Sequence, residues 1–168
     1  MKKLKEETME IKIKSLEQAK KYTPLVPTYA IRIFSGCPEE NEDYGLLRYS
    51  KNYKVVRNYK FDDIDDPNFI DEDKKGFKIF DLEDARLIIS DFEEKRKECL
   101  ELMVHCRYGE GRSAALAAAL NNIFVLGEDS QRLFALYPKL NQLVYEKMIN
   151  LGVERGLNNL VKMRIQNL

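Results

Sequence analysis

One segment of the sequence combines residue types that can do chemistry at a spacing that brings them together. Residues 105–113 read HCRYGEGRS, so a histidine, a cysteine, two glycines, two arginines and a serine fall within nine positions. A cysteine thiol is a weak nucleophile until it ionises, and backbone N–H groups that curl into a helix N-terminus stabilise the thiolate. The same N–H groups can cradle a tetrahedral anion such as phosphate. The segment therefore predicts a nucleophilic cysteine in an anion-binding loop.

The residues that follow Cys106 fit this chemistry. Gly109 and Gly111 permit the unusual backbone angles of a cradle and a close approach to phosphate. Arg112 comes after five intervening residues, and its planar guanidinium can hold two phosphoryl oxygens. Ser113 can donate a hydrogen bond to the sulfur and ease its departure as a leaving group. The predicted phosphate-binding residues are thus Arg107, Tyr108, Gly109, Glu110, Gly111 and Arg112.

The pattern His-Cys-x5-Arg-Ser, supplied by His105, Cys106, Arg112 and Ser113, resembles the signature loop of the cysteine-dependent protein tyrosine and dual-specificity phosphatases. The resemblance is best over residues 53–125, and a looser likeness to small prokaryotic members runs from TYAIRIFS through YPKLNQLVYEKM. It implies a phosphatase that uses no metal or other cofactor and forms a phosphocysteine on Cys106. It also implies that His105 orients the loop and favours the thiolate.

The family further requires an aspartic acid on a mobile loop, which protonates the leaving oxygen and later activates water. The segment KFDDIDDP occupies the corresponding place in this chain. Asp63 is the first choice, by resemblance to dual-specificity enzymes in which the acid closely follows the strand. Asp62 is the second choice, and Asp65 and Asp66 stay open. The Trp-Pro-Asp form of this loop is missing, since the chain contains no tryptophan.

The elements that must position these residues alternate along the chain. Strand patterns occupy residues 9–13, 28–35, 53–61 and 100–106, and helical patterns occupy 15–22, 81–98, 113–126, 129–137, 140–151 and the tail to 168. Such alternation predicts an α/β fold with a mainly parallel central sheet flanked by helices, in one domain over residues 1–168. Ligands of these sheets bind at the carboxyl ends of strands. HCRYGEGRS follows a predicted strand and therefore falls at such an end.

Composition narrows the expected partners. Lys+Arg and Asp+Glu both number 28, so overall charge steers the chain toward neither nucleic acid nor an anionic membrane. No apolar run reaches the roughly 18 residues of a spanning helix, and the start lacks the apolar core of a signal peptide, so we expect a cytoplasmic protein. The three cysteines form neither a disulfide framework nor a metal pattern. Cys37 and Cys99 are expected to be structural, and either could bond Cys106 on oxidation if it lies close enough.

The combined expectation is hydrolysis of phosphate monoesters, above all of phosphotyrosine in proteins. The substrate would be a phosphorylated protein or a small phosphomonoester, and Glu110 together with the acidic segment disfavours polyanionic substrates. A phosphate-binding pseudophosphatase or interaction module is the main alternative, and a rhodanese-like sulfurtransferase or arsenate reductase is another. The aspartate-rich segment ahead of the cysteine favours the phosphatase.

Overall fold

Four parallel strands form the centre of the structure, a computed structural model that describes residues 8–157. The sheet has the order β1-β4-β2-β3, and every neighbouring pair of strands is parallel. The strands are β1 (Glu10–Lys14), β2 (Thr28–Phe34), β3 (Tyr53–Lys60) and β4 (Glu101–His105). The predicted α/β fold with a parallel central sheet flanked by helices is confirmed.

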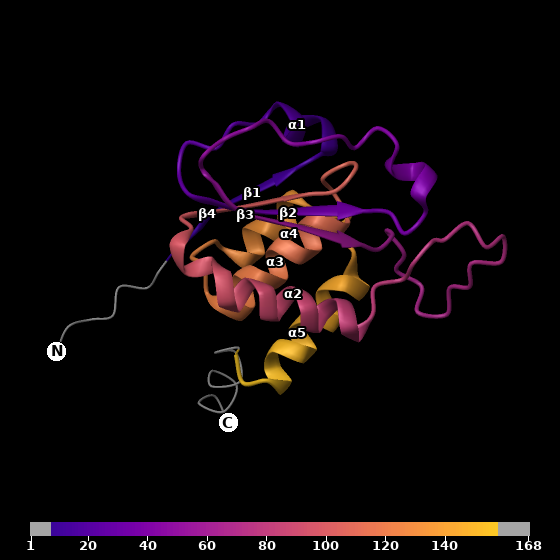
Figure 1. The fold of residues 1–168 in the computed structure, drawn as a ribbon. Coiled ribbons are helices and arrows are strands. Elements are labelled where there is room, and N and C mark those ends of the chain that lie inside the picture. The colour runs from indigo at the N-terminus through magenta and orange to yellow at the C-terminus, as the bar shows by residue number, and fades with distance from the viewer. Residues whose placement is uncertain (1–7, 158–168) are drawn as a thin grey trace, which may run out of the picture.

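Helices cover the two faces of the sheet unequally (Figure 1). On one face lies α1 (Leu16–Lys21), together with the 35–52 connection that contains a short 3-10 helix, Pro38–Asn41. The other face carries α2 (Leu82–Lys95) with its 3-10 extension Arg96–Glu98, α3 (Arg112–Phe124), α4 (Ser130–Leu136) and α5 (Gln142–Glu154). The larger hydrophobic core lies on this second face, and a small one, around Ala19, Ala30 and Met103, lies beneath α1.

Polar side chains fix where most helices begin. Ser15 starts α1 and Asp81 starts α2, each with a reciprocal capping box, and Asp129 and Asn141 cap α4 and α5. The helices predicted from the sequence pattern are therefore found close to their predicted starts.

Helix ends depart somewhat from the sequence pattern. α3 was expected to close near Gly127, but it ends at Phe124 because Val125 adopts a left-handed φ of 53° and already terminates the helix. α5 ends at Glu154. The helix predicted for the tail falls largely on residues 158–168, which lie outside the described residues. None of the helices within residues 8–157 is long and apolar enough to cross a membrane.

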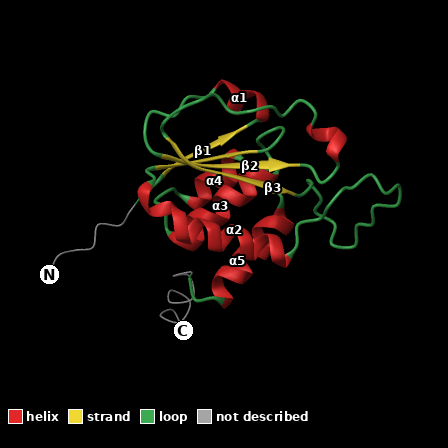
Figure 2. Ribbon diagram, viewed as in Figure 1, coloured by secondary structure: helices red, strands yellow, loops and turns green. Residues whose placement is uncertain are grey.

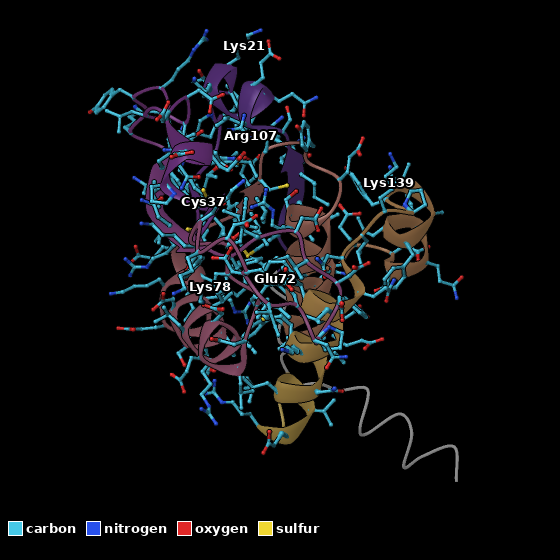
Figure 3. All side chains as sticks on the ribbon, turned by 90° about the vertical axis from the view of Figure 1, so that its right-hand side faces the viewer. Lys21, Cys37, Glu72, Lys78, Arg107 and Lys139 are labelled. Carbon is cyan, nitrogen blue, oxygen red and sulfur yellow. The ribbon has the colours of Figure 1, made fainter. Side chains whose placement is uncertain are left out.

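All four strands end at the same edge of the sheet, and this edge positions the candidate site. The residues that directly follow β1, β2, β3 and β4 are Ser15, Ser35, Phe61 and Cys106. The long connection from β3 to α2 leaves this edge and projects beyond the sheet (Figure 2). Figure 3 looks onto the same edge and shows Arg107 between Lys21 of α1 and Glu72 of that connection. Segments far apart in sequence thus meet here.

Candidate active site

The segment from residue 106 to 111, called the nucleophile loop below, joins β4 to α3 and surrounds the sulfur of Cys106. Cys106 is 2% exposed. Its Sγ accepts a hydrogen bond from the Gly109 N–H at 3.3 Å and lies 3.1 Å from Ser113 Oγ. Because α3 begins at Arg112, the sulfur lies near the helix end that has free N–H groups and the positive end of the dipole. This environment favours negative charge at the sulfur.

Gly109 lets the nucleophile loop pack directly on the end of β1. Its φ of 72° is left-handed, which glycine adopts readily. A Cβ at this position would lie 2.6 Å from Ser15 N and 2.7 Å from the carbonyl carbon of Lys14. The neighbouring Arg107 carbonyl accepts a hydrogen bond from Leu16 N at 3.0 Å. The loop is therefore held from outside by β1 and α1.

Arg112 is anchored by one nitrogen and keeps a second one free for a ligand. The residue is 8% exposed, and its Nη1 donates to Phe61 O at 2.9 Å. Its buried Nε–H has no hydrogen-bond partner among residues 8–157. A buried donor without a partner costs about 1–3 kcal/mol, and an oxygen of a bound anion would satisfy it. Arg112 thus has the placement of a phosphate clamp.

Asp63 places its carboxylate against the last residue of the nucleophile loop. Asn141 Nδ2 donates to Asp63 Oδ1 at 2.8 Å and to Ile64 O at 3.2 Å. A Cβ on Gly111 would lie only 2.4 Å from Asp63 Oδ2, so the carboxylate occupies the space that the glycine leaves. Asn141 also donates its backbone N–H to Gly111 O at 3.1 Å. One residue therefore ties the aspartate and the loop together.

Asp62, the adjacent candidate, is occupied by backbone contacts instead. Its Oδ2 accepts hydrogen bonds from Gly36 N at 3.0 Å and from Lys78 N at 2.7 Å, and its Oδ1 accepts one from Ser35 Oγ. It is buried, whereas Asp63 is exposed. Asp62 thereby joins the start of the 61–80 segment to its end at Lys78. This segment is called the acid loop below, and its joined ends are called the neck. The remaining candidates, Asp65 and Asp66, are exposed and do not line the cavity described next.

A cavity of about 350 Å³ lies beside the nucleophile loop. It brings together Asp63 and Arg112 with several aromatic side chains. The lining residues are Ser35, Glu40, Tyr44, Asp62, Asp63, Ile64, Phe69, Phe77, Arg107, Tyr108 and Arg112. An aryl group could lie among these rings while an attached phosphate reaches the arginine. The cavity thus combines an aromatic wall with an arginine that can bind an anion.

The other side chains of the nucleophile loop point to neighbouring elements. Arg107 makes a two-pronged ion pair with Asp43, at 2.7 and 3.0 Å, and its hydrogen bonds raise the pKa of Arg107 and lower that of Asp43. Glu110 lies 3.7 Å from Lys139 in an exposed pair. Tyr108 is 76% exposed at the cavity wall. Arg107 and Tyr108 line the cavity, whereas Glu110 does not. Because these side chains have other partners or point to solvent, phosphate contacts from the three residues would come from their backbone N–H groups.

His105 is buried behind the nucleophile loop. Arg32 Nε donates to His105 Nε2 at 2.9 Å, and His105 Nδ1 lies 3.3 Å from Cys106 O. Burial and, next, the nearby charge of Arg32 lower the pKa of His105 to about 4. The imidazole is therefore uncharged at neutral pH.

Sequence reasoning missed several residues that the fold brings to this site. Asn141 and Arg32 contact Asp63 and His105, while Tyr44, Phe69 and Phe77 form the aromatic wall. A charged residue inside the apolar strand TYAIRIFS was a signal for Arg32, because a buried arginine needs partners. The aromatic wall comes from loops that carry no periodic pattern.

Among the described residues, the cysteines form no disulfide and the possible metal ligands do not cluster. Cys37, Cys99 and Cys106 are all buried and free. Within residues 8–157 no group of three or more His, Cys, Asp or Glu side chains could hold a metal ion.

Comparison with known proteins returns a distant structural likeness. No protein-family model matches the chain, and no curated protein matches it. A solved structure described as "Crystal structure of Tk-PTP in the active form" gives a TM-score of 0.44 at 20% sequence identity, over 82% of this chain and 83% of that one. A likeness so distant says nothing about the chemistry of this chain, whose own residues must carry it.

The two adjacent aspartates are expected to differ in their effect on stability. Asp62→Ala leaves three donors without their acceptor and should lower the free energy of unfolding by about 2–4 kcal/mol. Asp63→Ala, the matched control, should change it by less than about 1 kcal/mol, because Asn141 keeps its bond to Ile64 O. Urea unfolding of both variants measures the difference. Equal losses would contradict the assigned structural role of Asp62.

The buried histidine predicts a specific pH dependence of stability. The pKa of His105 is about 4 in the folded chain and about 6.5 when unfolded, so the unfolded chain binds the extra proton between these values. Stability should therefore fall as the pH drops from 6.5 to 4, by about 3 kcal/mol from this group. His105→Gln should lack that component. Urea unfolding at several pH values tests this, and parallel profiles for the two proteins would refute it.

Proposed function

We propose that this chain hydrolyses phosphate monoesters, with Cys106 as the nucleophile and Arg112 as the clamp on the phosphoryl oxygens. The observation that carries the proposal is the convergence of three groups at one helix start. Ser113 Oγ lies 3.1 Å from Cys106 Sγ, Arg112 retains an unpartnered Nε–H within the described chain, and Asp63 touches Gly111. A thiol nucleophile, an anion clamp and a carboxyl acid are the groups that phosphoryl transfer through a cysteine requires.

In the first step the Cys106 sulfur forms a bond to phosphorus while the bond from phosphorus to the ester oxygen breaks. The carboxyl group of Asp63 gives its proton to that oxygen, so the alcohol leaves neutral. Arg112 and the N–H groups of the nucleophile loop, Arg107 to Gly111, stabilise the charge on the three remaining oxygens. The product is a phosphocysteine.

In the second step a water oxygen forms a bond to phosphorus while the phosphorus–sulfur bond breaks. Asp63, now a carboxylate, accepts the proton of the water. Ser113 Oγ, at 3.1 Å, donates a hydrogen bond to the departing sulfur of Cys106. Inorganic phosphate is released and the thiolate is restored. His105 supports the loop through its contact with the Cys106 carbonyl.

We infer that the preferred substrate is phosphotyrosine in a protein. Four aromatic side chains line the cavity, namely Tyr44, Phe69, Phe77 and Tyr108. They favour an aryl phosphate over an alkyl one, because aromatic rings pack in offset and edge-on contacts. Glu40 and Asp63 line the same cavity and disfavour additional phosphate groups on the substrate.

The direct test is hydrolysis of para-nitrophenyl phosphate and phosphotyrosine by the native chain without added metal. Cys106→Ser should lose activity by roughly 1000-fold or more, because it removes the nucleophile. Asp63→Asn should lower kcat on phosphotyrosine by about 100-fold, because it removes the proton donor. Asp73→Asn, an exposed carboxylate of the same acid loop, is the matched control and should retain native activity.

Two outcomes would overturn the proposal, and a third would exclude the acid that it names. Activity that survives Cys106→Ser would exclude the thiol mechanism. A native chain that binds vanadate but hydrolyses neither ester would instead be a phosphate-binding module. Equal effects of Asp63→Asn and Asp73→Asn would exclude Asp63 as the acid.

The contact between Gly111 and Asp63 generates a second kinetic prediction. Gly111→Ala places a methyl group where Asp63 Oδ2 lies, so the carboxylate must move. We expect kcat on phenyl phosphate, which needs the acid, to fall about tenfold or more, and kcat on para-nitrophenyl phosphate to fall much less.

A double variant distinguishes this effect from general damage to the loop. Adding Gly111→Ala to Asp63→Asn should cause little further loss, since both changes act on the same proton transfer. Vanadate affinity should stay near the native value. Additive losses, or a collapse of vanadate binding, would contradict the assigned contact.

A further inference from the structure

Arg32 is a cation buried in the middle of the sheet without a carboxylate partner in the described part of the chain. It is 4% exposed, and its three nitrogens donate to neutral acceptors: His105 Nε2 at 2.9 Å, Gly45 O at 2.9 Å and Tyr44 O at 3.3 Å. Burying a cation without a counterion is costly, and the burial lowers the pKa of Arg32. The cost of burying this charge therefore indicates that Arg32 has a role in the protein that compensates for it.

We propose that Arg32 is a positioning residue for the Cys106 nucleophile and acts through His105. An N–H that points at Nε2 requires a lone pair there, so the ring proton must be on Nδ1. Nδ1 lies 3.3 Å from Cys106 O and donates to it. The chain of contacts thus runs from Arg32 through the imidazole to the backbone of the nucleophile.

The hydrogen bond to Cys106 O sets the orientation of the first peptide of the nucleophile loop. In a planar trans peptide the C=O and the following N–H point in opposite directions. Holding the Cys106 carbonyl toward His105 therefore directs the Arg107 N–H away from the histidine. The positive charge of Arg32 behind this peptide also favours an anion on the far side. Fixing the imidazole tautomer accordingly fixes part of the cradle.

Other charged or titratable groups also face His105, from each neighbouring element. Tyr44 lies with its ring centroid 5.9 Å away, Arg112 adds a charge that lowers the histidine pKa, and Lys14 of β1 is its register partner. The Cys106 carbonyl acts in the opposite direction. Of these neighbours, Arg32 is the one whose hydrogen bond reaches Nε2. The tautomer therefore depends on Arg32.

The chain contains one histidine, so its imidazole can be observed without ambiguity. In a long-range proton–nitrogen NMR spectrum of the full chain labelled with 15N-histidine, the native protein should show the Nδ1-protonated tautomer. The ring should stay uncharged down to about pH 5. In Arg32→Met the proton should distribute over both nitrogens, and the ring should charge at higher pH.

The alkylation rate of Cys106 tests whether the tautomer of His105 affects the nucleophile. The rate at which iodoacetamide alkylates Cys106, followed by mass spectrometry at pH 6, should fall about tenfold in Arg32→Met. Arg57→Met is the matched control, because it removes an arginine of the neighbouring strand β3 that pairs with Asp91 at 3.8 Å. It should leave both the tautomer and the alkylation rate unchanged.

Arg32→Gln separates the hydrogen bond from the charge and serves if Arg32→Met does not fold. Its side-chain nitrogen occupies the place of arginine Nε, so the variant should keep the Nδ1-protonated tautomer, while the imidazole charges at higher pH because the cation is gone. Loss of the tautomer in this variant would contradict the inference.

The inference is overturned by an unchanged tautomer in Arg32→Met, and equally by a changed tautomer with native alkylation kinetics. It rests on the proposed function only for its consequence in catalysis. If the native chain hydrolyses no phosphate ester while Arg32→Met alters both readouts, the proposed function falls and the positioning role of Arg32 stands.

Discussion

The candidate site depends on bringing the N-terminus of α3 to the carboxyl end of β4. The helix is buried along almost its whole length, between the sheet, α4 and α5. Small side chains allow this close packing, and the buried ones are Ala114, Ala115, Ala117, Ala118 and Ala119. Because the helix start cannot shift without disturbing the core, the short loop between Cys106 and Arg112 has fixed ends. The positions of Cys106 and Arg112 are thus set by the packing of the main core.

Three arginines hold the loops around the site in place through hydrogen bonds. Each donates to a backbone carbonyl of a connection that follows β2 or β3: Arg32 to Gly45 O, Arg107 to Glu40 O and Arg112 to Phe61 O. Within residues 8–157, Arg107 is the member of this set that forms an ion pair, with Asp43. The charges of the other two are balanced by dipoles, which stabilise them without cancelling their field. An anion near the start of α3 therefore experiences both the helix dipole and the charge of two guanidinium groups that have no carboxylate partner within residues 8–157.

Local patterns in the sequence predict the parts of the structure that are themselves local. Capping residues and alternating hydrophobic periods placed the strands and helices, and the spacing from Cys106 to Arg112 placed the nucleophile loop at a strand end. Those local patterns do not distinguish the surroundings of Asp62 from those of Asp63, and the order of preference given above came from the family resemblance. Two adjacent side chains at the end of a strand face opposite ways, and only their tertiary partners show which one is buried and which one faces the nucleophile loop. Asn141 and Arg32 lie far from the residues they contact in sequence, so no local signal could connect them.

Different parts of the acid loop hold Asp63 and line the cavity. Its neck is closed by Asp62, which binds Lys78 N, and by the close approach of Gly36 to Gly76, where a Cβ would lie 2.4 Å from a carbonyl oxygen. Asp63 lies at this neck, beside the nucleophile loop, whereas Phe69 comes six residues later in the same segment and lines the cavity. A change in the projecting part would alter the aromatic wall and the access of substrate. The carboxylate would keep its place, because Asn141, which donates to it, is buried at the start of α5 and is also bonded to Gly111 O.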